Sequence, residues 1–440
     1  MRDQNINISS GLWLFLTAFL LIFYFPGTLK GAGIPSIEDV IEEKAQVPRI
    51  EELTDGKVKE GDLINKDNMD LVKEYLTPGV AEAIRQGMVL IMRPQLPVDK
   101  IVPKFFIELT KKNDGKAIID ENGTVYYEKM GTPWPGGCPF TRPKNALEAM
   151  ANTKYGWVLD DVRQYPNILV FNSSDGKDYK TLYMDHLYVN CNCRHLVPPF
   201  GTYPGYEDVM FKRISVTTSP LALKGLGQFT VRHYDDAKKY DAGFAYLPAF
   251  KRTVRISATT WQDNIGGSDW TFGDGGILQE PYSDWDFKSA TLKYMLMPEP
   301  DPPFPYIKKD ATLDSRLQFD VGRKFGRLGW AIWPVYEVEA IPKIKHIYGK
   351  KVFYVNTWPY WPATWEINLS DSYDRQMKLW KVSWMCRAVL SYKDMSFVST
   401  SSGPMHDLQT GHSSTFWFSQ EVTELKPDDV TLTTLLQAGR

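Results

Sequence analysis

Several features that would assign this chain of 440 residues to a particular class of protein are scarce or missing. Its charges nearly cancel, with 51 Lys and Arg against 53 Asp and Glu, and no dense basic run breaks that balance. This argues against a nucleic-acid-binding surface, which needs a clustered positive field. Beyond the N-terminal region, no apolar run approaches the roughly 20 residues of a membrane-spanning helix. We find no internal repeat.

Cysteine is rare as well, with four residues, and none precedes Cys138. A leader therefore cannot end in a lipid-modified cysteine, which excludes an acylated lipoprotein. An even number in an exported protein permits disulfides, but the sequence leaves open how Cys138, Cys191, Cys193 and Cys386 pair. The one-residue spacing of Cys191 and Cys193 fits zinc poorly, even with His195 nearby, because structural zinc sites space paired cysteines by two to four residues. We predict structural thiols or disulfides and no metal.

Recognised catalytic motifs are missing too. None of the six histidines lies in such a motif. The glycine-rich segment of residues 263–286 offers carboxylates for calcium, but its spacing misses the EF-hand and nonapeptide patterns. Its aspartates are Asp263, Asp269, Asp274, Asp284 and Asp286. We predict no catalytic residue, no cofactor and no enzyme activity, with a hydrolase of glycans or lipids as a less favoured alternative.

The N-terminus has the composition of a secretory signal peptide. Arg2 lies in a short polar start, Leu12–Phe25 is almost wholly apolar, and the small residues Gly31–Gly33 follow. The apolar core, about 14 residues, is shorter than a spanning helix needs, so an uncleaved anchor is the weaker alternative. We predict a signal peptide over residues 1–33, cleaved near Gly33, and a single β-rich domain over residues 34–440.

Strand-like alternation runs through most of the chain and is clearest between Trp380 and Leu390. Alternate residues there are apolar, while Lys381, Ser383 and Arg387 fall on the other face. Further strands are predicted at Ile101–Thr110, Lys116–Ile119, Val125–Met130, Ile168–Asn172, Thr181–Asn190, Val209–Thr217, Gly227–Tyr234 and Arg252–Ala258. Their number predicts a wide antiparallel sheet, curved or nearly closed.

Helical segments are fewer. The pattern over Asp67–Met88 is interrupted at Thr77-Pro78-Gly79, where proline can begin a new helix, so two short helices are expected. Ala146–Asn152 is a further short helix. The tail carries an apolar patch that is expected to dock on the sheet. This patch consists of Val430, Leu432, Leu435 and Leu436.

Aromatic residues make up 13% of the chain and gather near its C-terminal third. They include Trp358, Tyr360, Trp361, Trp365, Trp380 and Trp384. Burying so many indoles is difficult, because each N–H needs a partner. Two interpretations stay open. The aromatic residues either line a pocket for an apolar ligand or form plain core packing with an aromatic rim.

Several motifs resemble those of an uncharacterised family of exported Gram-negative proteins, catalogued as a domain of unknown function and often labelled outer-membrane lipoprotein-sorting-protein-like. These motifs are Leu76–Gly79, Cys138–Ala149, Phe250–Arg255, Ile347–Asn356, Tyr373–Arg375 and Leu379–Lys381. The resemblance implies the fold of periplasmic lipoprotein carriers. That fold is mainly β, a strongly curved antiparallel sheet that forms an unclosed barrel, with a few helices plugging its concave face. The two helices before Pro97 would contribute to the plug.

The resemblance also implies a periplasmic or outer-membrane-facing binding or carrier protein for a lipid or another hydrophobic ligand, working with an envelope exporter or outer-membrane barrel. The residues expected to line the ligand cavity are Tyr348, Phe353, Trp365, Trp380 and Trp384. The alternative is an envelope structural or interaction module without a small ligand, which requires exposed Trp358 and Trp361.

Overall fold

The computed structural model describes residues 47–95, 102–156, 159–256, 261–299, 325, 328–356, 367–393 and 395–438. All of them lie in one unit defined by internal contacts, Pro35–Arg440. The predicted signal peptide lies outside the described residues, as do Trp358, Trp361 and Trp365. Leader cleavage and the domain boundary near residue 34 therefore stay predictions. Within the described ranges, no helix has the length and apolar character needed to cross a membrane.

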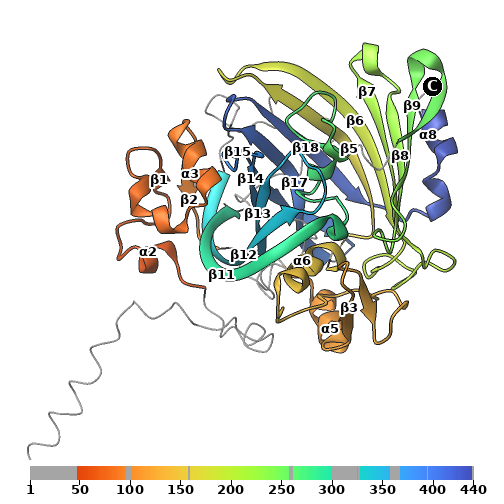
Figure 1. The fold of residues 1–440 in the computed structure, drawn as a ribbon, viewed down its shortest axis with the longest axis horizontal. Helices are drawn as coiled ribbons and strands as arrows, with labels where there is room; N and C mark the ends of the chain where they lie inside the picture. Colours follow the sequence, from red (N-terminus) through yellow and green to blue (C-terminus); the bar gives the residue numbers. More distant parts are fainter. Residues whose placement is uncertain are drawn as a thin grey trace, which may run out of the picture. The chain divides into compact units, whose positions relative to one another are not determined.

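One large sheet organises the described residues (Figure 1). Its main path is, in hydrogen-bonded order, β1 (Leu63–Ile64), β2 (Leu90–Met92), β12 (Leu328–Pro342), β13 (Lys350–Asn356), β14 (Leu369–Tyr373), β15 (Leu379–Trp384), β17 (Met395–Asp407), β18 (Ser413–Val422), β5 (Asp161–Asn172), β6 (Asp178–Asn190), β7 (Val209–Ser219), β8 (Gly227–His233), β9 (Ala242–Leu247) and β10 (Arg252–Ile256). β11 (Trp285–Glu299) pairs with β12, and β16 (Cys386–Tyr392) pairs with β17. A separate hairpin joins β3 (Ala117–Ile119) to β4 (Val125–Tyr127).

Antiparallel pairing dominates this sheet, and the contact between β2 and β12 is parallel. Among the described strands, β10 at one end pairs with β9 and β11 at the other end pairs with β12, so the sheet does not close on itself. This confirms the predicted mainly β fold with an unclosed antiparallel sheet. The helices are α2 (Ile50–Leu53), η2 (Met69–Leu71), η3 (Lys73–Tyr75), α3 (Pro78–Arg85), α5 (Lys104–Asn113), α6 (Ala146–Tyr155), η4 (Leu221–Leu223), η5 (Pro248–Phe250), η7 (Phe272–Asp274), η8 (Tyr282–Asp284), η9 (Pro427–Asp429) and α8 (Leu432–Ala438).

One face of the sheet, here called the inner face, is covered by helix α6 and by the covering loop, residues 261–284. Side chains of the inner face pack in one core with Trp270 and Ile277 of the loop and Met150 of α6. Those side chains include Leu169, Leu182, Met184, Phe353 and Met405. The covering loop is the glycine-rich acidic segment of the sequence. Because this loop covers the inner face, the side chains of that face lie in the interior of the molecule.

The opposite, outer face carries helices α3 and α8. Leu435 of α8 and Val430 pack with Ile214 and Phe229, and α8 lies beside β8 and β9 (Figure 1). The predicted docking of the apolar tail on the sheet is therefore confirmed. Burial of Leu435 is complete, so this contact contributes to stability through the hydrophobic effect.

Helix α3 begins as the sequence predicted, with Pro78 in its first turn and Thr77 accepting a hydrogen bond from the Val80 amide. The helix packs on β14 and β15. A Cβ on Gly79 would lie 2.2 Å from Asp371 Oδ1, so only glycine permits this approach. Asp371 follows Ser370, whose cross-strand neighbour is the inner-face Phe353, so Asp371 points to the outer face. Helix α3, one of the helices before Pro97, thus packs on the outer face of the sheet and not on the inner face that the covering loop covers.

Other strand predictions are confirmed with one exception. The predicted strand Ile101–Thr110 is helix α5, because Phe106, Thr110 and Asn113 recur at helical spacing and are buried together. The strands predicted at Lys116–Ile119 and Val125–Met130 form the hairpin of β3 and β4, whose turn glycine Gly123 has a φ of +85°. The alternating run after Trp380 is divided into β15 and β16, with Met385 between them.

Asp371 is expected to make stability depend on pH. Its buried carboxyl accepts hydrogen bonds from the Gly79 amide (3.1 Å) and Thr77 Oγ1 (3.2 Å). Burial raises its pKa to about 7, although these hydrogen bonds oppose the shift. Because the folded pKa exceeds the unfolded value, the native state binds the extra proton, and stability falls as pH rises between about 4 and 7.

Asp371→Asn should flatten this pH dependence and stabilise the protein at pH 8 by up to about 4 kcal/mol. Urea unfolding at pH 5 and pH 8 measures both effects. Asp67→Asn, at an exposed position, is the control and should leave the slope unchanged. An unchanged slope in Asp371→Asn would contradict the prediction.

Candidate functional site

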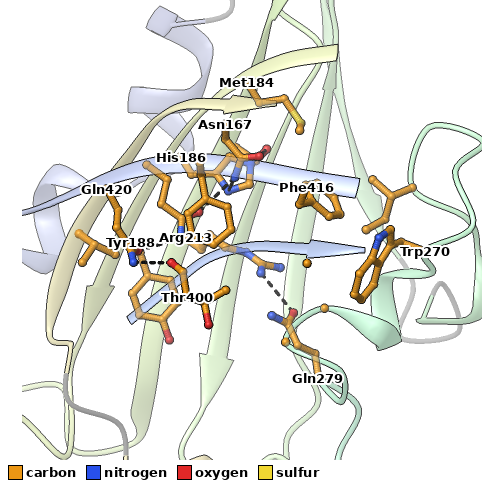
Figure 2. A pocket seen from close by; sticks show the side chains of 18 of the residues that line it. Asn167, Met184, His186, Tyr188, Arg213, Trp270, Gln279, Thr400, Phe416 and Gln420 are labelled. Atoms are coloured by element: carbon orange, nitrogen blue, oxygen red, sulfur yellow. Dashed lines mark hydrogen bonds between the residues drawn. The ribbon is translucent and has the colours of Figure 1, made fainter. Parts of the chain in front are cut away.

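A cavity of about 180 Å³ lies between the covering loop and the inner face of β5, β6, β7, β8, β17 and β18 (Figure 2). This volume is far above the roughly 10–15 Å³ that a single water needs. Most of the lining surface is apolar. The larger apolar side chains are Leu159, Val162, Met184, Ile265, Trp270, Phe272, Met385, Phe416 and Phe418.

A row of hydrogen-bonded polar side chains crosses the cavity wall from β7 to β18. His186 lies 2.7 Å from Ser215 Oγ through Nε2 and 3.3 Å from Asn167 Nδ2 through Nδ1. The Asn167 amide donates to Gln164 (3.2 Å), and Gln164 donates to Gln420 (3.3 Å). Because the Asn167 NH₂ group faces Nδ1, the imidazole proton lies on Nε2 and is donated to Ser215.

Burial, with a smaller contribution from the charge of Arg213, lowers the pKa of His186 to about 3. The imidazole is therefore neutral at physiological pH. Burial also raises the pKa of Tyr188 well above its ordinary value, so its hydroxyl keeps its proton. The polar row is consequently a neutral hydrogen-bonded structure across adjacent strands, in which Asn167 Oδ1 is buried without a partner among the described residues.

Among the described residues that line the cavity, Arg213 is the one that carries a charge. Its Nη1 donates to Gln279 Oε1 of the covering loop at 3.2 Å. Asp241, a nearby carboxylate, is bound by Arg232 at 2.6 and 3.1 Å. Burial lowers the pKa of Arg213, but a guanidinium still keeps its charge. Figure 2 shows the Arg213 guanidinium directed toward Gln279.

The covering loop is fixed to the sheet by buried polar contacts. Asp274 accepts from Lys351 Nζ (2.5 Å) and from Tyr348 Oη (2.7 Å). Glu280 lies 2.9 Å from His346 Nε2 and accepts from Trp285 Nε1 at 2.7 Å. Burial on its own would raise the pKa of Asp274, but the nearby lysine charges outweigh it and hold that pKa below its ordinary value. Carboxylates that the sequence offered to calcium thus serve to anchor the loop.

Asp269 is another residue that fixes the covering loop to the sheet. Its backbone carbonyl accepts from Lys381 Nζ, and its carboxylate accepts from Ser414 Oγ, both at 2.6 Å. Within the described ranges, no group of three or more His, Cys, Asp or Glu side chains is arranged to hold a metal ion.

The four cysteines are buried free thiols. Burial raises the pKa of Cys191 to about 12 and that of Cys386 to about 11, so neither is a thiolate at neutral pH. Of the two alternatives left open by the sequence, structural thiols and disulfides, the structure has thiols. The loop around Cys191 and Cys193 is organised by Arg194, which forms a buried ion pair with Asp161 at 2.6 Å.

The aromatic residues predicted to line a cavity lie in two places. Tyr348 and Trp380 contact each other, with ring centroids 5.5 Å apart, beside the base of the covering loop. Phe353 is fully buried in the inner-face core. Trp384 follows Val382 on the outer face, where it packs against His406 with ring centroids 4.9 Å apart.

Trp365, the fifth candidate, lies outside the described residues. The four described candidates are not among the side chains that line the 180 Å³ cavity, and their contact with a ligand stays a prediction. Sequence reasoning missed Arg213, Gln279 and the polar row. The part of this site on β6 and β7 has a signal in the sequence, because polar residues occupy alternate positions there. They are His186 and Tyr188 on β6, and Arg213 and Ser215 on β7.

Fold and site together define a β-sheet protein whose sheet and covering loop line a mostly apolar cavity. The chain belongs to the family described as "Protein of unknown function (DUF1329)", whose sequence model matches residues 63–433. The family resemblance seen in the motifs is thereby confirmed. No curated protein matches the chain.

Several solved structures are similar to this chain, including the following three. A domain from Vibrio parahaemolyticus described as an outer membrane lipoprotein-sorting protein has 17% identity and a TM-score of 0.43, covering 66% of this chain and 98% of that one. A DUF1329 family protein from Desulfovibrio piger has 15% identity and a TM-score of 0.43, with coverages of 66% and 96%. A LolA superfamily protein from Nitrosomonas europaea has 12% identity and a TM-score of 0.38, with coverages of 66% and 100%.

Proposed function

We propose that this chain is a binding or carrier protein for a lipid or another hydrophobic ligand, held in the 180 Å³ cavity. The observation that carries the proposal is the set of apolar side chains that line the cavity, Trp270 and Phe416 among them (Figure 2). A mostly apolar concave site with a few placed polar groups is typical of small-molecule binding. Each buried CH₂ group contributes about 0.8 kcal/mol to such binding.

A periplasmic or outer-membrane-facing location and an exporter or outer-membrane barrel partner belong to the same proposal. They rest on the leader-like residues 1–33 and on the resemblance of the motifs, and a cleaved signal peptide would be expected. N-terminal sequencing of protein recovered from the periplasmic fraction tests the location. Recovery of the chain in the cytoplasm with its first residues intact would contradict it.

Ligand binding is tested by mass spectrometry of organic extracts from protein purified without detergent, together with titration of an apolar fluorescent probe. We expect a co-purifying lipid and displacement of the probe by added lipid. Phe416→Ser should weaken probe binding about tenfold or more, because it removes a large apolar side chain from the cavity wall.

Phe250→Ser is the matched control, since Phe250 is 68% exposed and does not line the cavity. It should bind the probe like the wild type. Absence of both extractable lipid and probe binding in the wild type would overturn the proposed function. An equal loss in both variants would remove the cavity as the site.

The Ser215–His186 contact of 2.7 Å favours a second candidate, a hydrolase acting on an ester in the cavity. Two observations weigh against it. The imidazole donates to Ser215, so it is not placed to accept the serine proton, and burial lowers its pKa to about 3, which makes it a weak base. We expect a fluorophosphonate probe to leave Ser215 unlabelled, and labelling that Ser215→Ala abolishes would establish the hydrolase instead.

A further inference from the structure

The single charge in the cavity indicates the polar end of the ligand. We propose that the cavity takes an amphiphile of the fatty-acid type, with one carboxylate that binds Arg213 and a hydrocarbon chain that lies against Trp270 and Phe416. The inference rests on the proposed function, because it names the class of hydrophobic ligand. It adds a head-group site that apolar packing alone does not provide.

Arg213 differs from two other arginines of this part of the chain, Arg194 and Arg232, which are paired with carboxylates. Arg194 pairs with Asp161 at 2.6 Å, and Arg232 pairs with Asp241 at 2.6 Å. The ion pairs of the described residues include none for Arg213, whose hydrogen bond at 3.2 Å goes to the neutral amide of Gln279. Arg213 is partly buried in the cavity wall, and a guanidinium there that lacks a carboxylate partner provides a site for an anion.

The walls around Arg213 suit an anion. His186 and Tyr188 are neutral at physiological pH, for the reasons given above, and no Asp or Glu is among the cavity-lining residues of the described chain. Gln228 and Gln279 offer amide groups that can donate hydrogen bonds. The carboxylate that acts on Arg213 is Asp241, and it is held by two hydrogen bonds from Arg232. An anion in the cavity therefore meets the Arg213 charge and amide donors, and no carboxylate among the lining residues of the described chain.

The single positive charge of Arg213 is balanced by a ligand that carries a single negative charge. The planar guanidinium presents paired N–H donors that match a carboxylate, and such charge-assisted pairs are roughly twice as strong as neutral hydrogen bonds. Trp270 and Phe416 form an apolar part of the wall, and Arg213 is the single cation among the described lining residues (Figure 2). Charge balance and the apolar wall thus favour a single-chain monocarboxylate. Gln279 lies on the covering loop, so the bound head group would also contact the segment that closes the cavity.

The experiment compares dodecanoate with dodecanol, which share a chain and differ in charge, by calorimetric titration of the full-length protein below the micelle concentration. The wild type should bind dodecanoate at least tenfold more tightly than dodecanol. Arg213→Gln should abolish this preference, and Arg213→Lys should keep part of it because the charge remains. From octanoate to dodecanoate, affinity should rise about fourfold per methylene.

Arg163→Gln is the matched control, because Arg163 lies on the same sheet but pairs with Asp185 at 2.6 Å and does not line the cavity. It should keep the preference of the wild type. Arg213→Gln should also melt, without ligand, at a temperature no lower than the wild type, since the substitution removes a partly buried charge that has no ion-pair partner among the described residues.

The possible outcomes separate this inference from the proposed function. If neither dodecanoate nor dodecanol binds the wild type, the proposed function fails. If the wild type binds both equally, or if Arg213→Gln keeps the preference for the acid, the head-group site is refuted while hydrophobic binding stands. Should Arg213→Gln fail to fold, the acid and alcohol affinities of the wild type and Arg213→Lys decide the matter.

Discussion

Arg194→Met is expected to lower the free energy of unfolding by about 5 kcal/mol or more. The fully buried guanidinium donates to both carboxylate oxygens of Asp161, at 2.6 and 3.0 Å. It also donates to the backbone carbonyls of Asn190 (2.5 Å), Val197 (3.0 Å) and Pro199 (2.9 Å). Methionine fills similar space but leaves a buried carboxylate and three carbonyls without these donors. Breaking a buried ion pair costs about 3–5 kcal/mol before the carbonyls are considered.

Urea unfolding of Arg194→Met and Arg163→Met at pH 8 measures this effect. Arg163 pairs with Asp185 at a partly exposed position, so its loss should cost no more than about 1 kcal/mol. Burial raises the pKa of Asp161 to about 6 even with Arg194 in place. Without the arginine, the proton is bound still more strongly, so the defect should be smaller at pH 5 than at pH 8. A loss within about 1 kcal/mol of the control would contradict the role assigned to Arg194.

The strands of this protein could be predicted because their signal is local. Val209–Thr217 and Thr181–Asn190 alternate apolar and polar residues, and both lie in strands that extend only a few residues further. The apolar tail around Leu435 also had a local signal, since a short amphipathic segment needs a surface to cover. Local patterns failed at Ile101–Thr110, where apolar residues satisfy both periods and packing selects the helix.

The role of Arg194 had no local signal. In the sequence it lies between Cys193 and His195, two residues that suggest a metal site, and its partner Asp161 is 33 positions away. Only the pairing of β5 with β6 brings the two side chains together. Long-range ion pairs of this kind are set by topology, which a single sequence does not specify.

The residues that line the cavity likewise could not be predicted from local sequence patterns. The density of tryptophan around residues 358–384 drew attention to that part of the chain, whereas the cavity takes Trp270 from the covering loop and Phe416 from β18. The polar alternation of His186 and Tyr188 was visible, but it is also typical of a solvent-facing strand. Which face becomes interior depends on where the covering loop packs, and that depends on contacts such as Asp274 with Lys351.

Lys351→Met is expected to destabilise the protein by about 3–5 kcal/mol, because it leaves the Asp274 carboxylate buried without its cation. Both side chains are almost completely buried, 2% and 1% exposed, and Lys351 Nζ also donates to the Ile277 carbonyl at 3.1 Å. Asp274→Asn should cost a similar amount by stranding the lysine. The double variant should lose clearly less than the two single losses combined, and a double-mutant cycle from urea unfolding measures this coupling.

Lys350→Met is the matched control on the same strand. Lys350 points to the other face and pairs with Glu339 at 3.1 Å in a partly exposed position, so its replacement should cost at most about 1 kcal/mol. Hydrogen exchange locates the effect, because only Lys351→Met should lower the protection of amides in residues 261–284. A weaker attachment of the covering loop should also speed release of a bound apolar probe. Equal stability, loop protection and probe release in the two lysine variants would show that the ion pair does not hold the loop over the cavity.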